Sequence, residues 1–221
     1  MAVAEIVVVV PAHDEEELLP RCLTSLVNAA QYARVPVEVL VVADACSDRT
    51  AAIARQFGRL VEVDVKNVGA ARRMGFEQVR RTSDTWLATT DADSEVPVGW
   101  FAAQLHHAAA GVELVAGTVR VDNWSGYLPD KQRLYEWSYG GADPETRIHG
   151  CNLAFRGTTY WALGGFAPLP LREDVALVTR FVEAGANVVW TDESPVVTSA
   201  RRTSRLAGGF AQHLADMESA L

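Results

Sequence analysis

The chain has 221 residues and a net charge of −8, with 49% hydrophobic and 22% charged residues. This composition is typical of a globular protein and excludes a disordered chain, and the acidic balance disfavours nonspecific nucleic-acid binding. No apolar run approaches the roughly 20 residues that cross a bilayer, the N-terminus lacks a signal-peptide pattern, and the three cysteines have no CxxC spacing. We therefore expect a cytoplasmic protein with reduced thiols, no transmembrane segment and no nucleic-acid partner.

Runs of β-branched residues alternate with helical patterns through the first half of the chain. The predicted strands are residues 6–10, 37–42, 60–65 and 86–90. Helical spacing predicts helices from residue 16 or 17 to 30, from 47 or 48 to 56, over 69–81 and over 97–110. Strands that are apolar on both faces are typical of a parallel sheet covered by helices on both sides. The expected fold class is therefore α/β, with a doubly wound, mostly parallel sheet.

The alternation ends after about Val121. A stretch rich in Trp, Tyr, Gly and Asp follows, and then residues 151–155 and a helix over 173–184 that Gly185 stops. The chain has no Gly/Ser/Pro-rich linker and no internal repeat, so we expect one continuous domain over residues 1–221.

Polar groups follow each predicted strand, where ligands bind in open parallel sheets. In strand order they are Pro11-Ala12-His13-Asp14-Glu15-Glu16, then Asp44, then Asn67 with residues 69–75, then Asp91-Ala92-Asp93. Because the carboxyl ends of parallel strands meet at one edge of the sheet, we expect these groups to converge.

The triplet Asp91-Ala92-Asp93 offers two carboxylates in one turn. Two close carboxylates repel each other unless a cation or a proton intervenes. Carboxylate oxygens suit Mn²⁺ or Mg²⁺, which commonly bridge to substrate phosphates. Such a triplet alone fits an ordinary solvated turn, but its position after a buried strand favours a divalent-metal site formed by Asp91 and Asp93.

Three of these motifs, in this order and spacing, resemble those of glycosyltransferase family 2, over residues 7 to about 202. VVVVPAHDEE, which ends at Glu16, is similar to the family's opening strand and Pro-Ala-x-Asn-Glu-Glu loop, with Asp14 where Asn is usual. VVADACSDRT, which ends at Thr50, resembles the second motif, whose first Asp recognises the nucleotide base. Asp91-Ala92-Asp93 is the third motif. The resemblance implies the GT-A fold of nucleotide-diphospho-sugar transferases.

Two later segments extend the resemblance. Ala71-Arg72-Arg73-Met74-Gly75 is similar to a family helix start, which implies that Arg72 approaches the nucleotide or diphosphate; the alternative is a surface arginine. The segment from His149 to Arg156 resembles one beside the donor sugar, where Gly150 would allow close approach and Asn152 would bond to hydroxyls. His149 is not assigned to the metal.

Arg172-Glu173-Asp174 resembles the family motif whose Asp is the general base. Asp174 shares a helical face with Leu177, Val178 and Phe181, so partial burial would raise its pKa towards that of a useful base. A helix-capping carboxylate is the alternative. Glu173 would lie to one side and orient Asp174 or bind the acceptor.

The resemblance implies an inverting, metal-dependent transfer of a hexose-type sugar from a UDP- or GDP-sugar to an acceptor hydroxyl. Residues 1–121 would bind the nucleotide, residues 122–202 would bind the acceptor and carry the catalytic groups, and residues 203–221 would form a tail. The implied nucleotide-sugar site is Pro11, Ala12, His13, Glu15, Asp44, Arg72, Asp91, Ala92, Gly150 and Asn152. A sugar-1-phosphate nucleotidyltransferase, an Asp-nucleophile phosphatase and a non-catalytic sugar-nucleotide binding module are the alternatives.

The sequence leaves the acceptor open among a small molecule, a glycan and a lipid-linked intermediate. An aromatic group could be an acceptor platform or simply core, and a basic group could be a tail that closes over the diphosphate or a solvated face. The first is Trp124, Tyr127, Tyr135, Trp137 and Tyr139, and the second is Arg201, Arg202 and Arg205. Peripheral membrane association and a homodimer are also left open.

Overall fold

The computed structural model describes residues 2–121, 123–124, 127, 129–141, 143 and 147–201. Within these residues the strands form one sheet in the order β3-β2-β1-β4-β7-β6-β8-β5. The strands are β1 (Glu5–Ala12), β2 (Val37–Asp44), β3 (Arg59–Val63), β4 (Thr85–Thr89), β5 (Ser94–Glu95), β6 (Leu114–Val121), β7 (Leu153–Arg156) and β8 (Val188–Thr198). The helices are α1 (Leu19–Ala30), α2 (Thr50–Ala54), α3 (Val68–Glu77), α4 (Trp100–Ala109), α5 (Pro129–Gly141), α6 (Gly157–Ala162) and α7 (Glu173–Glu183), with a 3-10 turn at Gly150–Asn152.

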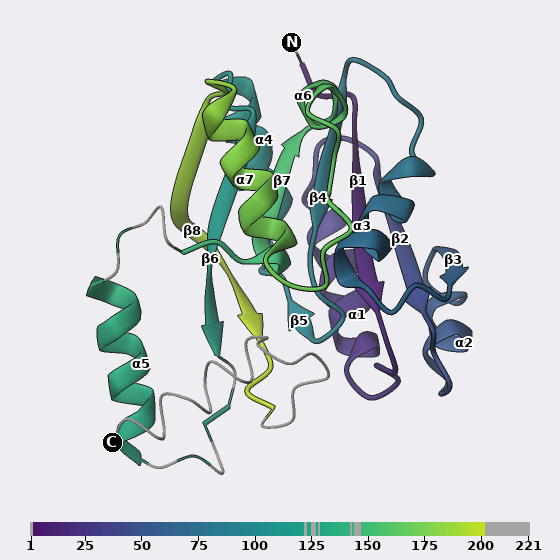
Figure 1. The fold of residues 1–221 in the computed structure, drawn as a ribbon, viewed down its shortest axis with the longest axis vertical. Coiled ribbons are helices and arrows are strands. Elements are labelled where there is room, and N and C mark those ends of the chain that lie inside the picture. The colour runs from purple at the N-terminus through teal and green to yellow at the C-terminus, as the bar shows by residue number, and fades with distance from the viewer. Residues whose placement is uncertain are drawn as a thin grey trace.

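The sheet is mixed. β1 pairs in parallel with β2 and β4, β2 with β3, and β6 with β8. β7 is antiparallel to β4 and β6, and β5 is antiparallel to β8. The carboxyl ends of β1, β2, β3, β4, β6 and β8 therefore lie at one edge, the lower edge in Figure 1. The predicted α/β fold is confirmed, and the antiparallel pairings lie in the second half of the sheet.

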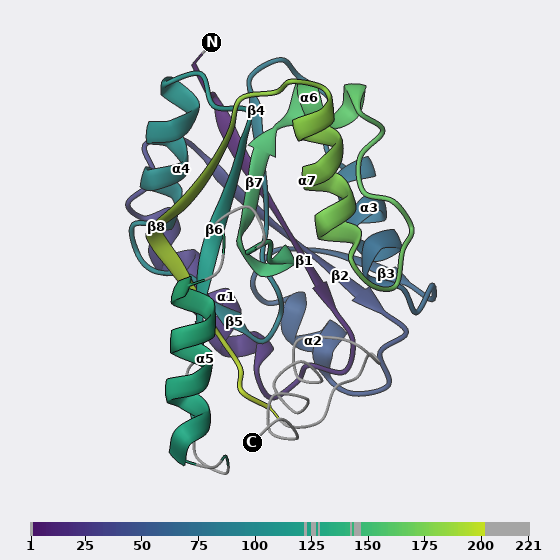
Figure 2. The same cartoon turned by 60° about the vertical axis from the view of Figure 1, so that its left-hand side comes forward.

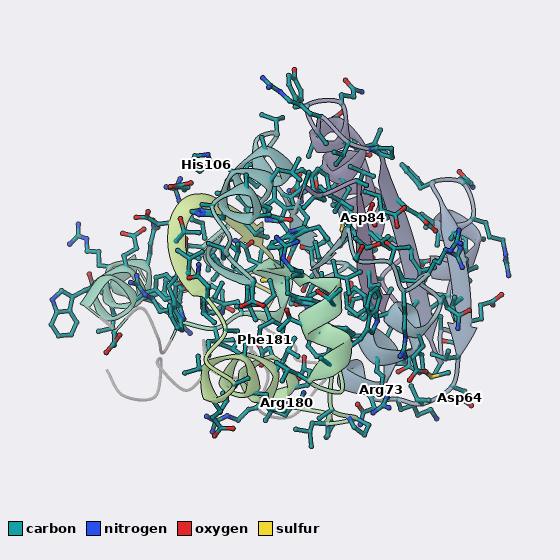
Figure 3. The ribbon with its side chains drawn as sticks, turned by 90° about the horizontal axis from the view of Figure 1, so that it is seen from above. Asp64, Arg73, Asp84, His106, Arg180 and Phe181 are labelled. Atoms are coloured by element: carbon teal, nitrogen blue, oxygen red, sulfur yellow. The ribbon has the colours of Figure 1, made fainter. Side chains whose placement is uncertain are left out.

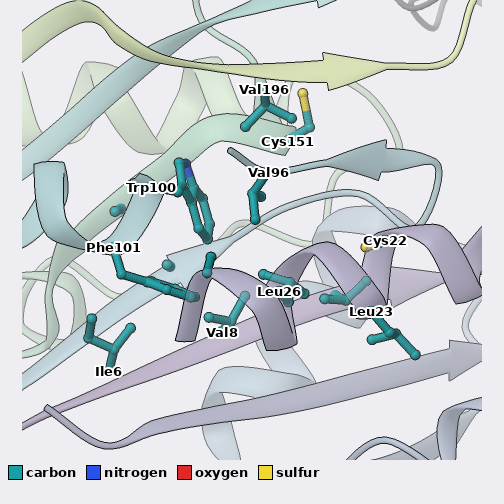
Figure 4. Close-up of a cluster of buried hydrophobic side chains, with 14 of the residues drawn as sticks. Ile6, Val8, Cys22, Leu23, Leu26, Val96, Trp100, Phe101, Cys151 and Val196 are labelled. Carbon is teal, nitrogen blue, oxygen red and sulfur yellow. The ribbon is translucent and has the colours of Figure 1, made fainter. Parts of the chain in front are cut away.

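Helices cover both faces of the sheet, so the side chains of β1 are buried on both sides. Ile6, Val8 and Val10 pack against the side of α1 and α4, while Val7 and Val9 pack against the side of α3 and α7. Figures 1 and 2 show these two helical layers with the sheet between them. Figure 4 shows the first layer, in which side chains of α1 and α4 meet β1.

An aromatic cluster joins α3 to α7 on the other face. The Phe155 ring of β7 lies 5.5 Å from the Phe76 ring of α3 and 6.1 Å from the Phe181 ring of α7, between centroids. Figure 3 shows Phe181 on the inner side of its helix and Arg180 on the outer side. Rings of this size bury a large apolar area, so they fix the distance between α3 and α7. Two residues of the site, Arg72 and Glu173, belong to these two helices.

Several predicted boundaries were wrong. α1 begins at Leu19 rather than at residue 16 or 17: the Leu19 N–H does bond to the Glu15 carbonyl, but Pro20 has no N–H that could bond to the Glu16 carbonyl and extend the helix there. β3 ends at Val63 rather than at residue 65, because the next N–H groups donate to the Asp44 carboxylate. Three other helices are shorter than predicted: α2, α3 and α4.

No residue range was predicted from the sequence for β5, β6, β8, α5 or α6. β8 carries Asp192, Glu193 and Pro195, which interrupt its β-branched pattern, and it reaches β6 across a register shift between Gly117 and Val119. α5 projects away from the sheet in Figures 1 and 2. No helix among the described residues has the length and apolarity to cross a bilayer.

Candidate active site

The Asp91-Ala92-Asp93 turn follows β4 at the carboxyl edge of the sheet, as predicted. Each carboxylate faces a guanidinium: Asp91 Oδ1 lies 2.5 Å from Arg72 Nη2, and Asp93 Oδ2 lies 3.0 Å from Arg201 Nη2. The Asp91 side chain is 38% exposed and the Asp93 side chain is 12% exposed. Asp91 is therefore open to a ligand from solvent, while Asp93 lies deeper.

Asp93 is an unusual carboxyl group. Burial raises the pKa of Asp93 to about 6, and the nearby Asp91 and Glu15 carboxylates act in the same direction against the opposing effect of Arg201. A proton or a cation is therefore needed to hold these acids together at neutral pH.

Glu15 belongs to the same cluster. Its side chain is buried, and Oε1 accepts a hydrogen bond from Arg201 Nη1 at 2.6 Å. Its own backbone N–H donates to Thr50 Oγ1 at 2.7 Å, so the β1–α1 loop is fixed to α2. Arg202 and Arg205, the other members of the predicted basic group, lie outside the described residues.

Arg72 is not the surface arginine that was one alternative. It is 2% exposed, and its Nη1 pairs with Glu173 while its Nε donates to Thr89 Oγ1 at 3.2 Å. Burial opposes the charged form, but the Asp91 and Glu173 carboxylates raise the pKa of Arg72 above its usual value. A fixed positive charge therefore lies directly behind Asp91.

Gly150 has a steric role beside this arginine. A Cβ atom at this position would lie 2.5 Å from Arg72 Nη2. The Gly150 N–H donates to Asp174 Oδ2 at 2.8 Å. The glycine therefore brings the Arg72 side chain and the Asp174 carboxylate to the same place.

Asp174 is partly buried, as expected, while its neighbour Glu173 is buried more deeply. Glu173 is 4% exposed and contacts Arg72, whereas Asp174 is half-buried at the start of α7. Burial raises the pKa of Glu173, while Arg72 counteracts the effect. Asp174 lies on the helical face of Leu177 but in the first turn, at the open edge of the sheet. Glu173 therefore lies against Arg72, and Asp174 is the more exposed of the two carboxylates.

Asn152 lies behind the site rather than in it. Its Oδ1 accepts from Trp100 Nε1 at 2.8 Å, and its Nδ2 donates to the carbonyls of Thr118 at 2.8 Å and Ser194 at 3.0 Å. The side chain is 5% exposed. The amide thus joins α4, β6 and β8, and the predicted contact with sugar hydroxyls does not fit this geometry.

Asp44 is held by the loop that follows β3. Its carboxylate accepts from the N–H groups of Val65 at 2.8 Å, Lys66 at 2.9 Å and Asn67 at 2.9 Å, and His13 Nδ1 lies 2.6 Å from its carbonyl. A hollow of about 340 Å³ opens beside it, lined by Ala43, Ala45, Cys46, Glu62, Val63, Asp64 and Lys66. Pro11 and Ala12 are buried at the end of β1. The hollow therefore lies at the ends of β2 and β3, and Asp44 stands between its lining residues Ala43 and Ala45; none of the expected nucleotide-binding residues is itself part of the lining.

The structure also brings together three residues that were not predicted from the sequence as metal ligands. Asp14, Cys46 and Asp48 each place a ligand atom within 4.8 Å of the others. Asp14 has a positive φ of 51°, and its carboxylate accepts from the N–H of Ser47 at 2.6 Å, which lowers the pKa of Asp14. In the sequence, Asp14 stands where the family usually has Asn. That position could have indicated this contact, because a short polar side chain there bonds to the neighbouring loop.

A larger hollow of about 440 Å³ lies between α5, β6 and β8. It is lined by Thr118, Val119, Arg120, Val121, Trp124, Gln132, Tyr135, Glu136, Tyr139, Gly140, Arg147, Asp192 and Pro195. The Tyr139 hydroxyl lies 2.9 Å from His149 Nε2 and accepts the Val119 N–H at 3.1 Å. His149 directly precedes Gly150, whose N–H donates to the Asp174 carboxylate.

Residues 7–164 match the sequence model of Glycosyl transferase family 2. The chain belongs to this family. It is 33% identical over 120 residues to "Glycosyltransferase AglE" of Haloferax volcanii, a match that covers 51% of this chain and 38% of that protein. It is 26% identical over 204 residues to "Probable glycosyltransferase YdaM" of Bacillus subtilis, covering 82% of this chain and 47% of that protein. The matches thus span less than half the length of both relatives.

Solved structures share the fold of this family 2 chain. A crystal structure of S. aureus TarS residues 1–349 in complex with UDP-GlcNAc has a TM-score of 0.70 at 13% identity, over 98% of this chain and 66% of that one. The mannosyltransferase PcManGT of Pyrobaculum calidifontis, in complex with GDP-Man and Mn²⁺, has a TM-score of 0.69 at 20% identity, over 93% of this chain and 59% of that one. The predictions of a GT-A fold and of membership in glycosyltransferase family 2 are confirmed.

The acidic turn of this family 2 chain fits a divalent metal. Among the described residues, Arg72 donates to Asp91 Oδ1 and the Ser94 hydroxyl donates to Asp93 Oδ1 at 3.4 Å, so Asp91 Oδ2 and Asp93 Oδ1 are the oxygens that the two residues can offer. Mg²⁺ is commonly held by one or two carboxylates together with substrate phosphates. A nearby positive charge would also stabilise the ionised form of the Asp93 carboxyl, which burial disfavours.

Proposed function

We propose that the chain transfers a hexose-type sugar from a UDP- or GDP-linked donor to an acceptor hydroxyl, with inversion at the anomeric carbon. The observation that carries the proposal is the meeting of Asp91, Arg72 and Asp174 at one edge of the sheet, through Gly150. An acid pair, a fixed cation and a solvent-accessible carboxylate are what a displacement at a phosphorylated carbon needs. The complexes of TarS with UDP-GlcNAc and of PcManGT with GDP-Man support a nucleotide-sugar donor.

Asp91 and Asp93 would hold a divalent metal, Mn²⁺ or Mg²⁺. When bound, the metal supplies positive charge to the departing diphosphate. Arg72 would add to this charge from the protein side, because the Asp91 carboxylate places its guanidinium at the edge of the site. The Mn²⁺ in the PcManGT complex supports this assignment.

Asp174 would act as the base. In the proposed step the acceptor oxygen bonds to the anomeric carbon, the bond from that carbon to the diphosphate breaks, and the acceptor proton moves to an oxygen of Asp174. The Gly150 N–H fixes Asp174 Oδ2 at 2.8 Å and so orients the carboxylate. Glu173 would act through Arg72 rather than on the substrate, since it is buried against that guanidinium.

The hollow beside Asp44 and His13 would receive the nucleotide base. Its walls come from the ends of β2 and β3, where ligands bind in open parallel sheets. The hollow between α5, β6 and β8 would receive the acceptor, because the Trp124, Tyr135 and Tyr139 rings line it and aromatic faces bind sugar rings and apolar groups.

A thermal-shift screen tests this function. UDP-, GDP- and dTDP-sugars are added with and without Mn²⁺, and a ligand that binds the folded state raises the apparent melting temperature. We expect a UDP- or GDP-sugar to stabilise the protein more with Mn²⁺ than without it. Absence of any shift with all donors would remove the proposal.

The released product separates the transferase from its main alternative. A glycosyltransferase releases a nucleoside diphosphate from its donor, whereas a sugar-1-phosphate nucleotidyltransferase releases pyrophosphate from a nucleoside triphosphate. The acidic loop after β1, with Asp14, Glu15 and Glu16, is a poor cradle for a triphosphate. We expect nucleoside diphosphate alone.

A further inference from the structure

The Arg201 guanidinium lies between the carboxylates of Glu15 and Asp93, where a bound cation would also be expected. Its Nη1 is 2.6 Å from Glu15 Oε1, and its Nη2 is 3.0 Å from Asp93 Oδ2. These carboxylates come from the β1–α1 loop and from the turn after β4, and their side chains are 7% exposed for Glu15 and 12% exposed for Asp93. One guanidinium therefore neutralises two largely shielded acids that otherwise repel each other.

The chain segment that carries Arg201 is attached to the site at two points. The end of β8 pairs with β5, where Thr198 Oγ1 accepts from Ser94 Oγ at 3.0 Å, next to Asp93. Two residues further on, the Ala200 carbonyl accepts from the Tyr127 hydroxyl at 2.8 Å. This backbone path leaves Arg201 within reach of Asp93, only three residues beyond the last residue of β8.

We propose that Arg201 is the competing cation of the metal site: its guanidinium occupies the Asp93 and Glu15 carboxylates when metal is absent, and metal binding releases it. The inference rests on the proposed metal role of Asp93. A divalent ion at Asp93 brings two positive charges next to the guanidinium, so the two cations disfavour each other.

The competition has a measurable cost. If the metal binds only the form in which Arg201 has left, its apparent affinity falls in proportion to the population of that form. The linkage is reciprocal, because metal binding must lower the affinity of Arg201 for its carboxylates by the same factor. Two independent measurements, on the metal and on the segment after β8, therefore report on one equilibrium.

Mn²⁺ binding without nucleotide is the first measurement. The free ion is followed by electron paramagnetic resonance in the wild type and in Arg201→Gln, and folding is checked by circular-dichroism melting. We expect the dissociation constant for Mn²⁺ to fall about fivefold or more in Arg201→Gln, the lower end of usual coupling between sites. An unchanged or weakened Mn²⁺ affinity overturns the inference.

Arg49→Gln is the matched control. Arg49 also pairs with a carboxylate at this edge of the sheet, since its Nε lies 3.0 Å from Glu16 Oε2, but its side chain is 81% exposed and is not in the acidic cluster. We expect its Mn²⁺ affinity to stay near the wild-type value. An equal gain in both variants would show a general effect of net charge and would overturn the inference.

Hydrogen exchange of the wild-type protein is the second measurement, and it does not depend on a variant that folds. We expect Mn²⁺ to speed exchange in peptides that cover residues 198–201; unchanged or slowed exchange overturns the inference. If neither wild type nor Arg201→Gln binds Mn²⁺, the proposed metal role fails with it. If both bind Mn²⁺ equally, only the role of Arg201 fails, and the transferase proposal stands on its own tests.

Discussion

The guanidinium of Arg72 lies against the carboxylate of Glu173, 101 residues further along the chain, and both side chains are buried. The ion pair joins α3 to the start of α7. It lies next to Asp91 and Asp174, the two residues proposed to act on the substrate. Burial of each charge carries a desolvation penalty, and this penalty is offset only while the oppositely charged partner is present. The predictions below begin with this pair.

Arg72→Met should lower the free energy of unfolding by about 3–5 kcal/mol, because it leaves the Glu173 carboxylate buried without its partner. Urea unfolding measures the loss. The control is Arg73→Gln, whose side chain is 46% exposed and pairs with Glu77 on the helix surface; its change should stay within about 0.5 kcal/mol. Equal losses in the two variants would mean that the buried pair contributes nothing special.

Asp174→Asn should keep donor binding and lose transfer. The amide conserves the shape of the side chain but cannot take the acceptor proton, so the rate should fall by about 10²-fold or more. Donor binding is read by thermal shift and transfer by release of nucleoside diphosphate. Asp84→Asn is the control, because Asp84 directly precedes β4 at the opposite edge of the sheet (Figure 3). Wild-type transfer in Asp174→Asn would remove it as the base.

Asp91→Ala should abolish both turnover and the stabilisation of the protein by a donor with Mn²⁺. The variant removes a proposed metal ligand and also one partner of Arg72. EDTA should have the same effect on wild-type activity, and added Mn²⁺ should reverse it. Full activity in the variant or in EDTA would contradict the metal role.

Asp93→Asn should change how stability depends on pH. The pKa of Asp93 is raised from 3.8 to about 6 in the folded protein, so between these values the unfolded chain releases its proton first and the wild type loses stability as pH rises. Asn has no such proton. The unfolding free energy of the variant relative to wild type should therefore increase by about 2–3 kcal/mol from pH 4 to pH 7. A difference that is constant over this range would contradict the raised pKa.

Gly117→Ala should destabilise the protein through Asn152. A Cβ atom at Gly117 would lie 2.3 Å from Asn152 Nδ2, so the amide would lose its bonds to β6 and β8. We expect a loss of about 1–3 kcal/mol, the cost of a buried polar group left unpaired. Gly140→Ala is the control, because nothing lies within 4 Å of a Cβ there and the helix should gain about 0.5–1 kcal/mol.

The sequence by itself determined the strand runs and the order of the motifs. The apolar runs that became β1, β2 and β4 are buried on both faces, and a continuous β-branched run has few other stable arrangements. That order was enough to place Asp44 and Asp91 at one edge of the sheet. The same reasoning did not find β8, because its central residues are polar and it is held by pairing with β6.

Only the tertiary structure decided which side chains at that edge are exposed. Glu173 and Asp174 are adjacent in sequence, yet the first is buried against Arg72 and the second is only half-buried, since a step of one residue along a helix turns the side-chain direction by about 100°. The Asn152 side chain bonds to Trp100 instead of facing the site, and Arg201 pairs with Glu15, which lies 186 residues earlier in the chain. Contacts at such separation arise from the packing of the whole sheet and helices, so local sequence patterns do not contain them.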